Sequence, residues 1–333
     1  MFRYATRVEK FVRIVSRETA FSLLDLLLLN TKGLLMKRKR KGPAVLLLVL
    51  ILITGFILSC VINARVLRIK EVTIRLPGLD RSLSGTRILF VSDLKITSEA
   101  DAKRTAKALA RICEAGPDML IIGGDLTGTS LYTSFRRSVF GESPAAAQED
   151  LKYARNVFLS EMNAVSLPLG KYMVMGDEDP AFSGSDSRLF DTVVLNRDSR
   201  GIRMGGSTLT LVGYPDYETG SRAFSYASAA SFDASGAVIV ISHDPRMYNT
   251  VPLNIGAYGG KTLILSGHGL NGQVRLFGHS LLYGDINRAY PGDGVYRDES
   301  GIPMLVSAGV GSEGLPFRFG TRPTAYLITL EAG

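Results

Sequence analysis

The chain has 333 residues, of which 46% are hydrophobic, and this is enough for one large α/β domain and an anchor. Its formal charge of +8 arises in residues 1–42, which hold 11 of the 39 Lys and Arg residues but only three of the 31 Asp and Glu residues. Residues 43–333 therefore carry 28 residues of each sign, a balance that argues against nucleic-acid binding and assigns the basic segment to a membrane surface.

The amino-terminal residues predict an anchor. In residues 1–42, basic side chains are interspersed with Phe, Val and Leu, which fits an amphipathic helix on the inner leaflet; a poorly ordered tail is the alternative. Residues 43–63 are apolar and long enough to cross a bilayer as one helix. Because the run KRKRK at 37–41 stands directly before them, the positive-inside rule predicts a single-pass protein of the cell membrane. Its amino terminus would be cytoplasmic and its main domain extracytoplasmic.

A signal sequence is a second interpretation of the same residues. If translation starts at Met36, the sequence from there to Cys60 has the shape of a lipoprotein signal, and Cys60 would carry the lipid. The domain is membrane-anchored and extracytoplasmic under either interpretation. The other cysteine, Cys113, falls in a predicted helix, so the sequence predicts no internal disulfide.

The rest of the chain reads as a connector and an α/β domain. Residues 64–84 form the connector, with an early edge strand at 70–76, and residues 85–333 form the domain. Helices are predicted at about 98–115 and 145–164, separated by a polar, turn-rich stretch at 128–143. Short strands dominate afterwards, at 208–212, 273–277, 304–307 and 325–330. In the first part of the domain helices alternate with strands, and in the last part strands follow one another as hairpins. This order indicates a four-layer α/β/β/α sandwich.

Five apolar runs end in a common pattern. The runs at 87–92, 119–122, 172–175, 237–241 and 262–266 read as buried strands, and each is followed closely by a carboxylate or a histidine. These residues are Asp93, Asp125, Asp177, His243 and His268. One such turn alone fits a solvated carboxylate or a hydrogen-bonded loop histidine. Five together predict converging ligands for Mn, Fe or Zn, because carboxylate oxygens and imidazoles suit these metals.

The motifs around these residues resemble one known family. The segments VSDLK, GGDLTG, MGDEDP, ISHDP, SGHGLNGQ and VSAGVGSEGLPFRFGTRP are similar to those of the calcineurin-like metallophosphoesterases. Within that family the chain looks most like a membrane-anchored branch that includes UDP-2,3-diacylglucosamine pyrophosphohydrolases. The resemblance covers residues from about 77 to 330. It implies the four-layer sandwich and a site for two metal ions.

Carried onto this sequence, the family pattern is only partly kept. Asp93, Asp125, His243 and His268 match metal ligands of the family, and Asp177 replaces an asparagine ligand. Lys95 and Leu270 stand where the family has two further ligand histidines, and Glu178 replaces the histidine that the family uses beside the leaving group. Both lost ligands belong to the same metal ion. The resemblance therefore implies one divalent ion, held by Asp125, Asp177, His243 and His268.

Lys95 and Glu178 are the candidate catalytic residues. The ammonium of Lys95 would take the place of the missing metal ion and neutralise Asp93 and Asp125; an ordinary solvated surface lysine is the alternative. One divalent ion and Lys95 together balance the charge of Asp93, Asp125 and Asp177. Glu178 would act as general acid or base if its acidic neighbours raised its pKa.

Two functions follow from this pattern. One is a membrane-anchored hydrolase of a phosphate ester or pyrophosphate, with the bilayer and a phosphorylated, lipid-linked substrate as its partners. The other is a catalytically inactive binding or scaffold protein that keeps the same fold. His279 is interpreted as a polar loop residue and not as a ligand.

Overall fold

The computed structural model describes residues 41–333 except 142, 181–187, 196, 215–235, 250–259, 283, 291 and 298–300. Nearly all of the predicted basic segment and the alternative start at Met36 lie outside the described residues. The chain divides into two compact units, Met1–Ser59 and Cys60–Gly333, which are described separately.

Helix α2 (Lys41–Asn63) contains the predicted span. Its residues Gly42–Asn63 are long and apolar enough to cross a membrane, and no other helix in the described part of the chain meets that test. Its leucines are largely exposed, as at Leu46, Leu52 and Leu58. A helix of this length and composition suits a membrane anchor or a signal sequence, and its orientation stays a prediction.

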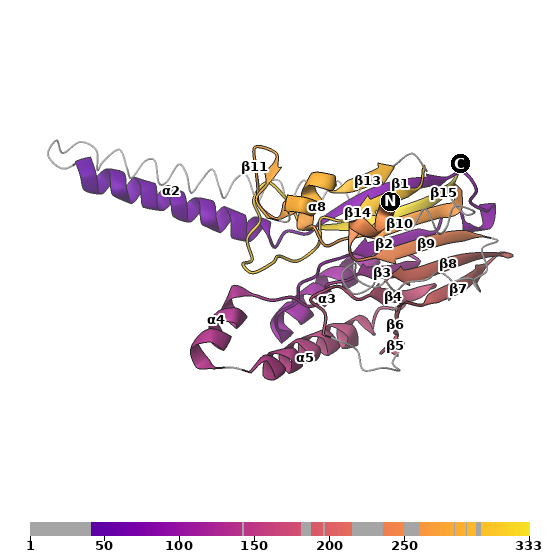
Figure 1. Ribbon diagram of the computed structural model, residues 1–333, viewed down its shortest axis with the longest axis horizontal. Coiled ribbons are helices and arrows are strands. Elements are labelled where there is room, and N and C mark those ends of the chain that lie inside the picture. The colour runs from indigo at the N-terminus through magenta and orange to yellow at the C-terminus, as the bar shows by residue number, and fades with distance from the viewer. Residues whose placement is uncertain are drawn as a thin grey trace. The chain divides into compact units, whose positions relative to one another are not determined.

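Two mixed β-sheets form the second unit (Figure 1). The first has the order β1-β15-β2-β3-β4-β6-β5. Its strands are β1 (Arg68–Leu76), β15 (Thr324–Ala332), β2 (Arg87–Val91), β3 (Met119–Gly123), β4 (Gly170–Val174), β6 (Thr192–Val194) and β5 (Arg188–Leu189). β2, β3, β4 and β6 run parallel, whereas β15 pairs antiparallel with β2 and parallel with β1.

The second sheet has the order β13-β14-β10-β9-β8-β7. Its strands are β13 (Gly294–Arg297), β14 (Pro303–Val306), β10 (Thr262–Ser266), β9 (Ala237–Ser242), β8 (Ser207–Tyr214) and β7 (Ser199–Met204). β8, β9, β10 and β14 are parallel, and the two edge strands are antiparallel. A separate two-stranded hairpin joins β11 (Arg275–Leu276) to β12 (His279–Ser280).

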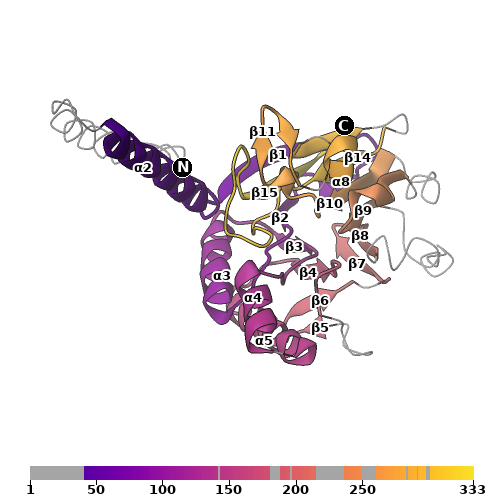
Figure 2. The same ribbon diagram turned by 60° about the vertical axis from the view of Figure 1, so that its left-hand side comes forward.

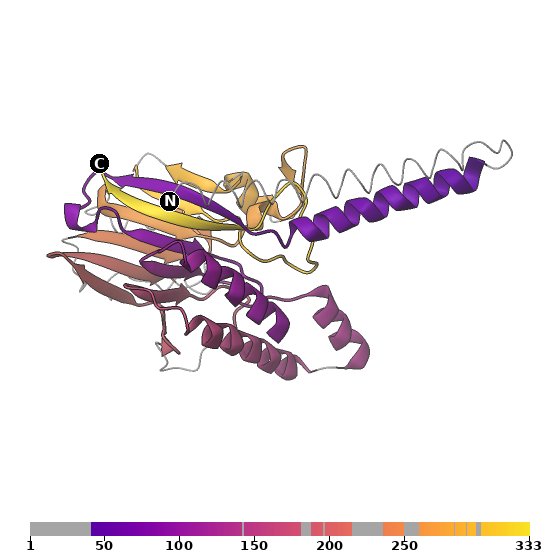
Figure 3. The ribbon, with the colours of Figure 1, turned by 180° about the vertical axis from the view of Figure 1, so that it is seen from behind.

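The sheets pack face to face because side chains alternate along their strands. On β2, Ile88 and Phe90 share a buried cluster with Ile239 of the second sheet, whereas Leu89 and Val91 point to the other face. Helices α3 (Glu99–Cys113) and α5 (Pro144–Met162) cover that other face (Figures 2 and 3). The predicted α/β class and both long helices are confirmed, each helix with a serine cap at Ser98 or Ser143.

The predicted four layers are found in part. Over the outer face of the second sheet, the described residues place the short helix α8 (Gly284–Ala289) and the 3₁₀ segment η3 (Pro245–Asn249), which bury apolar side chains there. The predicted turn-rich stretch 128–143 contains a further helix, α4 (Leu131–Phe140). The strand predicted at 273–277 is shorter than expected, because Gln273 and Phe277 adopt left-handed backbone angles and only Arg275–Leu276 is extended.

Candidate metal centre

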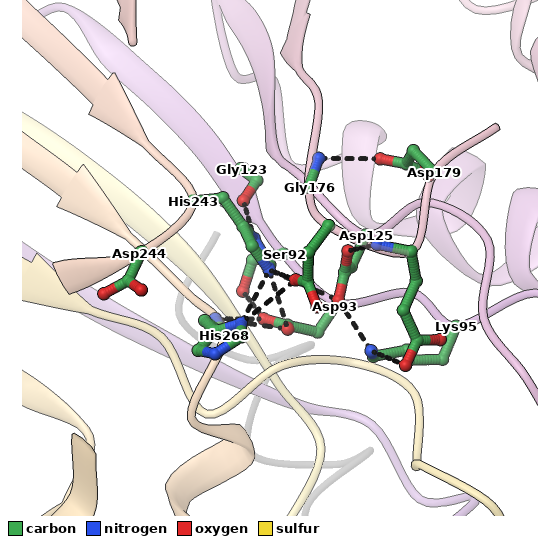
Figure 4. A network of polar contacts seen from close by, with 12 residues as sticks. Ser92, Asp93, Lys95, Gly123, Asp125, Gly176, Asp179, His243, Asp244 and His268 are labelled. Carbon is green, nitrogen blue, oxygen red and sulfur yellow. Dashed lines mark hydrogen bonds and ion pairs between the residues drawn. The ribbon is translucent and has the colours of Figure 1, made fainter. Parts of the chain in front are cut away.

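The five predicted ligands follow the carboxyl ends of strands from both sheets. Figure 4 labels four of them, Asp93, Asp125, His243 and His268. Asp93 follows β2, Asp125 follows β3 and His268 follows β10. The backbone turns sharply at these three residues, with φ angles of 48°, 51° and 68°. Such angles are uncommon for residues other than glycine, and they cluster at functional sites. Asp177 and His243 follow β4 and β9.

Four of the five side chains converge on one point. Asp125, Asp177, His243 and His268 each offer one ligand atom, and these atoms lie within 4.8 Å of one another. Nε2 of His243 lies 3.2 Å from an oxygen of Asp125 and 3.2 Å from one of Asp177. Nδ1 of His268 lies 3.2 Å from the same Asp177 oxygen. The predicted single-ion ligand set is therefore assembled in space, and its occupancy by metal stays a prediction.

The surrounding backbone orients these ligands. Nδ1 of His243 lies 2.9 Å from the carbonyl oxygen of Gly123, so the ring presents Nε2 to the cluster. The turn that carries Asp177 is held by Asp179, whose carboxylate accepts the N–H groups of Gly176 and Thr127 at 3.0 and 2.9 Å. Burial raises the pKa of Asp179.

The donor set fits one divalent ion. At metal–ligand distances of roughly 2.1 Å, neighbouring ligand atoms are about 3 to 4 Å apart, close to the separations at this cluster. Two carboxylates and two imidazoles suit Mn, Fe or Zn. Burial raises the pKa of Asp125 and of Asp177, but the neighbouring histidines outweigh it and hold both values below the usual range. Both carboxylates are thus ionised. Burial lowers the pKa of His243, but Asp125, Asp177 and Asp93 outweigh it and raise that pKa, so a metal ion would have to displace the proton on His243.

Asp93 lies beside the cluster and outside the converging set. It is fully buried, and both carboxylate oxygens accept the backbone N–H of His268, at 3.1 and 3.0 Å. The hydroxyl of Ser92 donates to it as well, at 2.6 Å. Its Oδ1 lies 4.0 Å from Nε2 of His243. Asp93 therefore positions the His268 turn, and its predicted role as a ligand is not tested by this geometry.

Lys95 is buried among carboxylates, which rules out a solvated surface lysine. Its side chain is 3% exposed, and Nζ lies 2.6 Å from Asp125, 3.3 Å from Glu178 and 2.9 Å from Glu313. Burial lowers the pKa of Lys95, but Asp125, Glu178 and the other carboxylates outweigh it and hold the pKa well above its usual value. The ammonium is therefore charged and shares Asp125 with the cluster.

Glu313 is a member of the site that sequence reasoning missed. Besides Lys95, it contacts the hydroxyl of Thr129, which donates to Oε1 at 3.0 Å. Its backbone is braced by Gln273, whose side-chain oxygen accepts the N–H of Glu313 at 2.6 Å and whose amide donates to the carbonyl oxygen of Glu313 at 2.9 Å. Glu313 follows no strand directly; its only signal in the sequence is its place in the late glycine-rich motif.

Glu178 lies at the outer edge of this group. One oxygen lies 3.3 Å from Lys95, and the other accepts the N–H of Thr129 at 2.9 Å. Burial raises the pKa of Glu178 to about 7, although Lys95 opposes the shift. A carboxyl group with this surrounding can both give and take a proton near neutral pH.

The second ligand histidine that the family has and this chain lacks is replaced by the apolar side chain of Leu270. Leu270 is fully buried, and a Cβ added to Gly309 would lie 2.6 Å from the Leu270 side chain and 3.0 Å from Cβ of Asp93. Leu270 therefore packs on the Asp93 side of the site and offers no ligand atom there. His279 lies exposed on β12 and is not among the converging residues.

A cavity of about 600 Å³ adjoins the site on the Lys95 side. Its lining includes Lys95 and Thr129 together with Leu67 and Arg104, but none of the four candidate ligands. A group bound in this cavity would therefore contact Lys95, whereas the metal cluster reaches solvent separately through Asp177, whose side chain is 41% exposed.

No family model matches the chain. Two curated relatives, both uncharacterized metallophosphoesterases of Helicobacter pylori, are 24% and 25% identical over 262 and 260 residues. Each match covers 76% of this chain, which spans 60% of the length of either relative. Over about three quarters of its length the chain is thus similar to proteins named as metallophosphoesterases.

Solved structures show weaker likeness. A dimetal phosphatase from Danio rerio is 12% identical, and the match covers 74% of this chain and 99% of that one with a TM-score of 0.44. The phosphopantetheinyl hydrolase of Mycobacterium tuberculosis is 9% identical over 70% of this chain and 91% of that one, with a TM-score of 0.33.

Proposed function

We propose that the chain is a membrane-anchored hydrolase of phosphoric esters or pyrophosphates that uses one divalent metal ion. The observation that carries the proposal is the shared carboxylate of Asp125. Its Oδ2 lies both 3.2 Å from Nε2 of His243 and 2.6 Å from Nζ of Lys95. An ammonium thus neutralises the carboxylate that two metal ions would otherwise share.

In such a reaction the residues of the site would have three roles: binding the metal ion, supplying positive charge and transferring a proton. Asp125, Asp177, His243 and His268 would hold the ion, which when bound supplies Lewis-acid chemistry to a phosphate group. Lys95 fixes Asp125 and adds positive charge beside the cavity. Glu178 is 23% exposed and lies within reach of Lys95, so it is placed to hold or accept a proton at its carboxylate.

The substrate class rests on less direct support. The apolar helix α2 and the sequence resemblance favour a phosphorylated, lipid-linked substrate close to the bilayer. Both curated relatives are named metallophosphoesterases, and their names state no substrate.

A second candidate function is a binding or scaffold protein without catalysis. The observation that favours it is the charge of the site. Five carboxyl groups lie around one ammonium, and when all are ionised they bring five negative charges against the three positive charges of Lys95 and one divalent ion, which opposes the binding of a phosphate dianion. These carboxylates are Asp93, Asp125, Asp177, Glu178 and Glu313.

Metal content and activity of the full chain in detergent separate these proposals. We expect about one equivalent of tightly bound Mn, Fe or Zn and hydrolysis of bis(p-nitrophenyl) phosphate. His268→Ala should lose both the metal and the activity, whereas the exposed control His279→Ala should keep them. Two bound equivalents would overturn the single-ion site. One bound equivalent without hydrolysis would favour the scaffold.

A further inference from the structure

Helix α4 turns an apolar stripe to solvent. Leu131, Phe135 and Val139 recur every fourth residue and therefore share one face of the helix. They are 55%, 59% and 55% exposed. A helix on the surface of a soluble domain normally buries such a stripe, so this one is available to an apolar partner.

Two neighbouring loops present further apolar side chains. Phe277, at the tip of the hairpin formed by β11 and β12, is 92% exposed, and Leu281 just after β12 is 63% exposed. Leu315, in the loop that follows Glu313, is 53% exposed. Isolated exposed apolar residues need no explanation, but a contiguous group marks an interaction surface.

One backbone segment, residues 314–321, joins these elements. The carbonyl oxygen of Gly314 accepts the N–H of Leu131 at 2.9 Å, at the start of α4. The carbonyl oxygen of Phe319 accepts the N–H of Arg275 at 2.8 Å, at the start of the hairpin. Both elements lie at the same end of the second unit (Figures 1 and 3). The exposed apolar side chains thus lie at one end of the unit, on two separate elements and on the segment that links them.

The same segment, residues 314–321, is hydrogen-bonded to the last turn of the apolar helix α2. The N–H of Arg318 donates to the carbonyl oxygen of Cys60 at 3.3 Å, and the side-chain amide of Asn63 donates to the carbonyl oxygen of Thr321 at 3.1 Å. Cys60 and Asn63 belong to the last turn of α2. Two exposed cations, Arg65 and Arg322, flank this junction and suit an anionic lipid surface.

We propose that six side chains, which we call the apolar collar, insert into the interfacial layer of the bilayer that holds α2. The collar consists of Leu131, Phe135, Val139, Phe277, Leu281 and Leu315. The bilayer is the favoured partner of the collar because the last turn of α2 is hydrogen-bonded to residues 314–321, the segment that links the collar elements. A membrane that holds α2 therefore stays close to the collar, at a high local concentration. The proposal rests on membrane anchoring by α2 and is independent of hydrolysis.

Docking by the collar would set the orientation of the site. Thr129 and Glu313 each stand two residues from a collar residue, Leu131 and Leu315, and so lie within about 7 Å of it along the chain. Both contact the group around Lys95. The collar therefore turns the Lys95 side of the site toward lipid headgroups, where an amphiphilic substrate would be met.

The chain contains no tryptophan, which permits a direct test. Two separate variants, Phe277→Trp and Phe135→Trp, would each place one tryptophan in the collar. Each full-length variant would be reconstituted in phosphatidylcholine–phosphatidylglycerol vesicles. Phe190→Trp is the matched control, because Phe190 is also an exposed phenylalanine, 47% exposed, with a left-handed backbone angle like that of Phe277. Brominated lipids should quench both collar variants several-fold more than the control.

Each outcome decides the proposal. Adding Phe135→Asp to Phe277→Trp should remove most of the lipid quenching while the circular dichroism spectrum stays unchanged. Quenching of Phe277→Trp no greater than that of Phe190→Trp would overturn bilayer insertion. Protection of Phe277→Trp from both brominated lipid and aqueous iodide would likewise overturn it and would assign the collar to a second copy of the chain. Retained quenching in a variant without metal would separate this result from the proposed hydrolysis.

Discussion

The ammonium of Lys95 holds together carboxylates that would otherwise repel one another. Lys95→Met keeps most of the side-chain volume but removes the charge, leaving Asp125, Glu178 and Glu313 without their shared partner. We expect the free energy of unfolding to fall by about 3 to 5 kcal/mol, as when one partner of a buried ion pair is removed. Urea unfolding of the metal-free protein measures this change.

A lysine of the same chain serves as control for that experiment. Lys103 pairs with Glu99 at 2.7 Å on the exposed face of α3, so Lys103→Met should leave the stability almost unchanged. If Lys95→Met is as mild as Lys103→Met, the ammonium does not stand in for a metal ion.

Gly124 gives His243 the space to reach the cluster. Its φ angle is 88°, and a Cβ there would lie 2.6 Å from Nδ1 of His243. Gly124→Ala should therefore displace the imidazole and abolish tight metal binding as measured by metal analysis. Gly85, with a φ angle of 92° and no atom within 4 Å of an added Cβ, is the matched control. Gly85→Ala should cost about 1 to 2 kcal/mol of backbone strain and leave the bound metal in place.

Among the elements, α3 is a helix whose beginning is set by one side chain. The hydroxyl of Ser98 accepts the N–H of Asp101 at 3.3 Å, and acidic residues follow in the first turn. Ser98→Ala should lower the free energy of unfolding by about 1 kcal/mol, and Ser98→Asp should restore most of it. Thermal unfolding followed by circular dichroism tests both; an unchanged midpoint for Ser98→Ala would mean that packing alone fixes the helix start.

The elements that the sequence predicted well are those with a strong local signal. The strands at β2, β3, β9 and β10 are short apolar runs stopped by glycine or serine, and their ends carry Asp93, Asp125, His243 and His268 together. The periodic apolar faces of α3 and α5 were equally clear.

The elements that the sequence did not predict depend on distant contacts. Helix α4 was missed because its apolar stripe faces away from the core, so its polar neighbours read as a turn. Glu313 was missed because it reaches Lys95 from a loop braced by Gln273, and pairings so far apart in sequence leave no periodic signal. Lys95 lies beside Asp125 as predicted, but its other two ion-pair partners are Glu178 and Glu313 and not the predicted Asp93.

For the whole molecule, charge predicts an orientation if α2 anchors the chain in a membrane. The basic residues at 37–41 stand directly before the apolar span Gly42–Asn63, so residues 64–333 should then lie outside the cytoplasm. Protease added to right-side-out membrane vesicles should digest the domain, whereas inside-out vesicles should protect it. The opposite pattern would reverse the orientation and place the site on the cytoplasmic surface.

The pairing of β1 with β15 determines when this edge of the first sheet can form during synthesis. In the first sheet β1 is an edge strand whose one neighbour is β15, and β15 lies between β1 and β2 along its length. The ribosome delivers β15 after every other described strand, so β1 waits without a partner throughout elongation. This edge of the sheet can therefore be completed only after the whole of β15, Thr324–Ala332, has been synthesised. Until then β1 is an unpaired strand that is open to pairing with another chain.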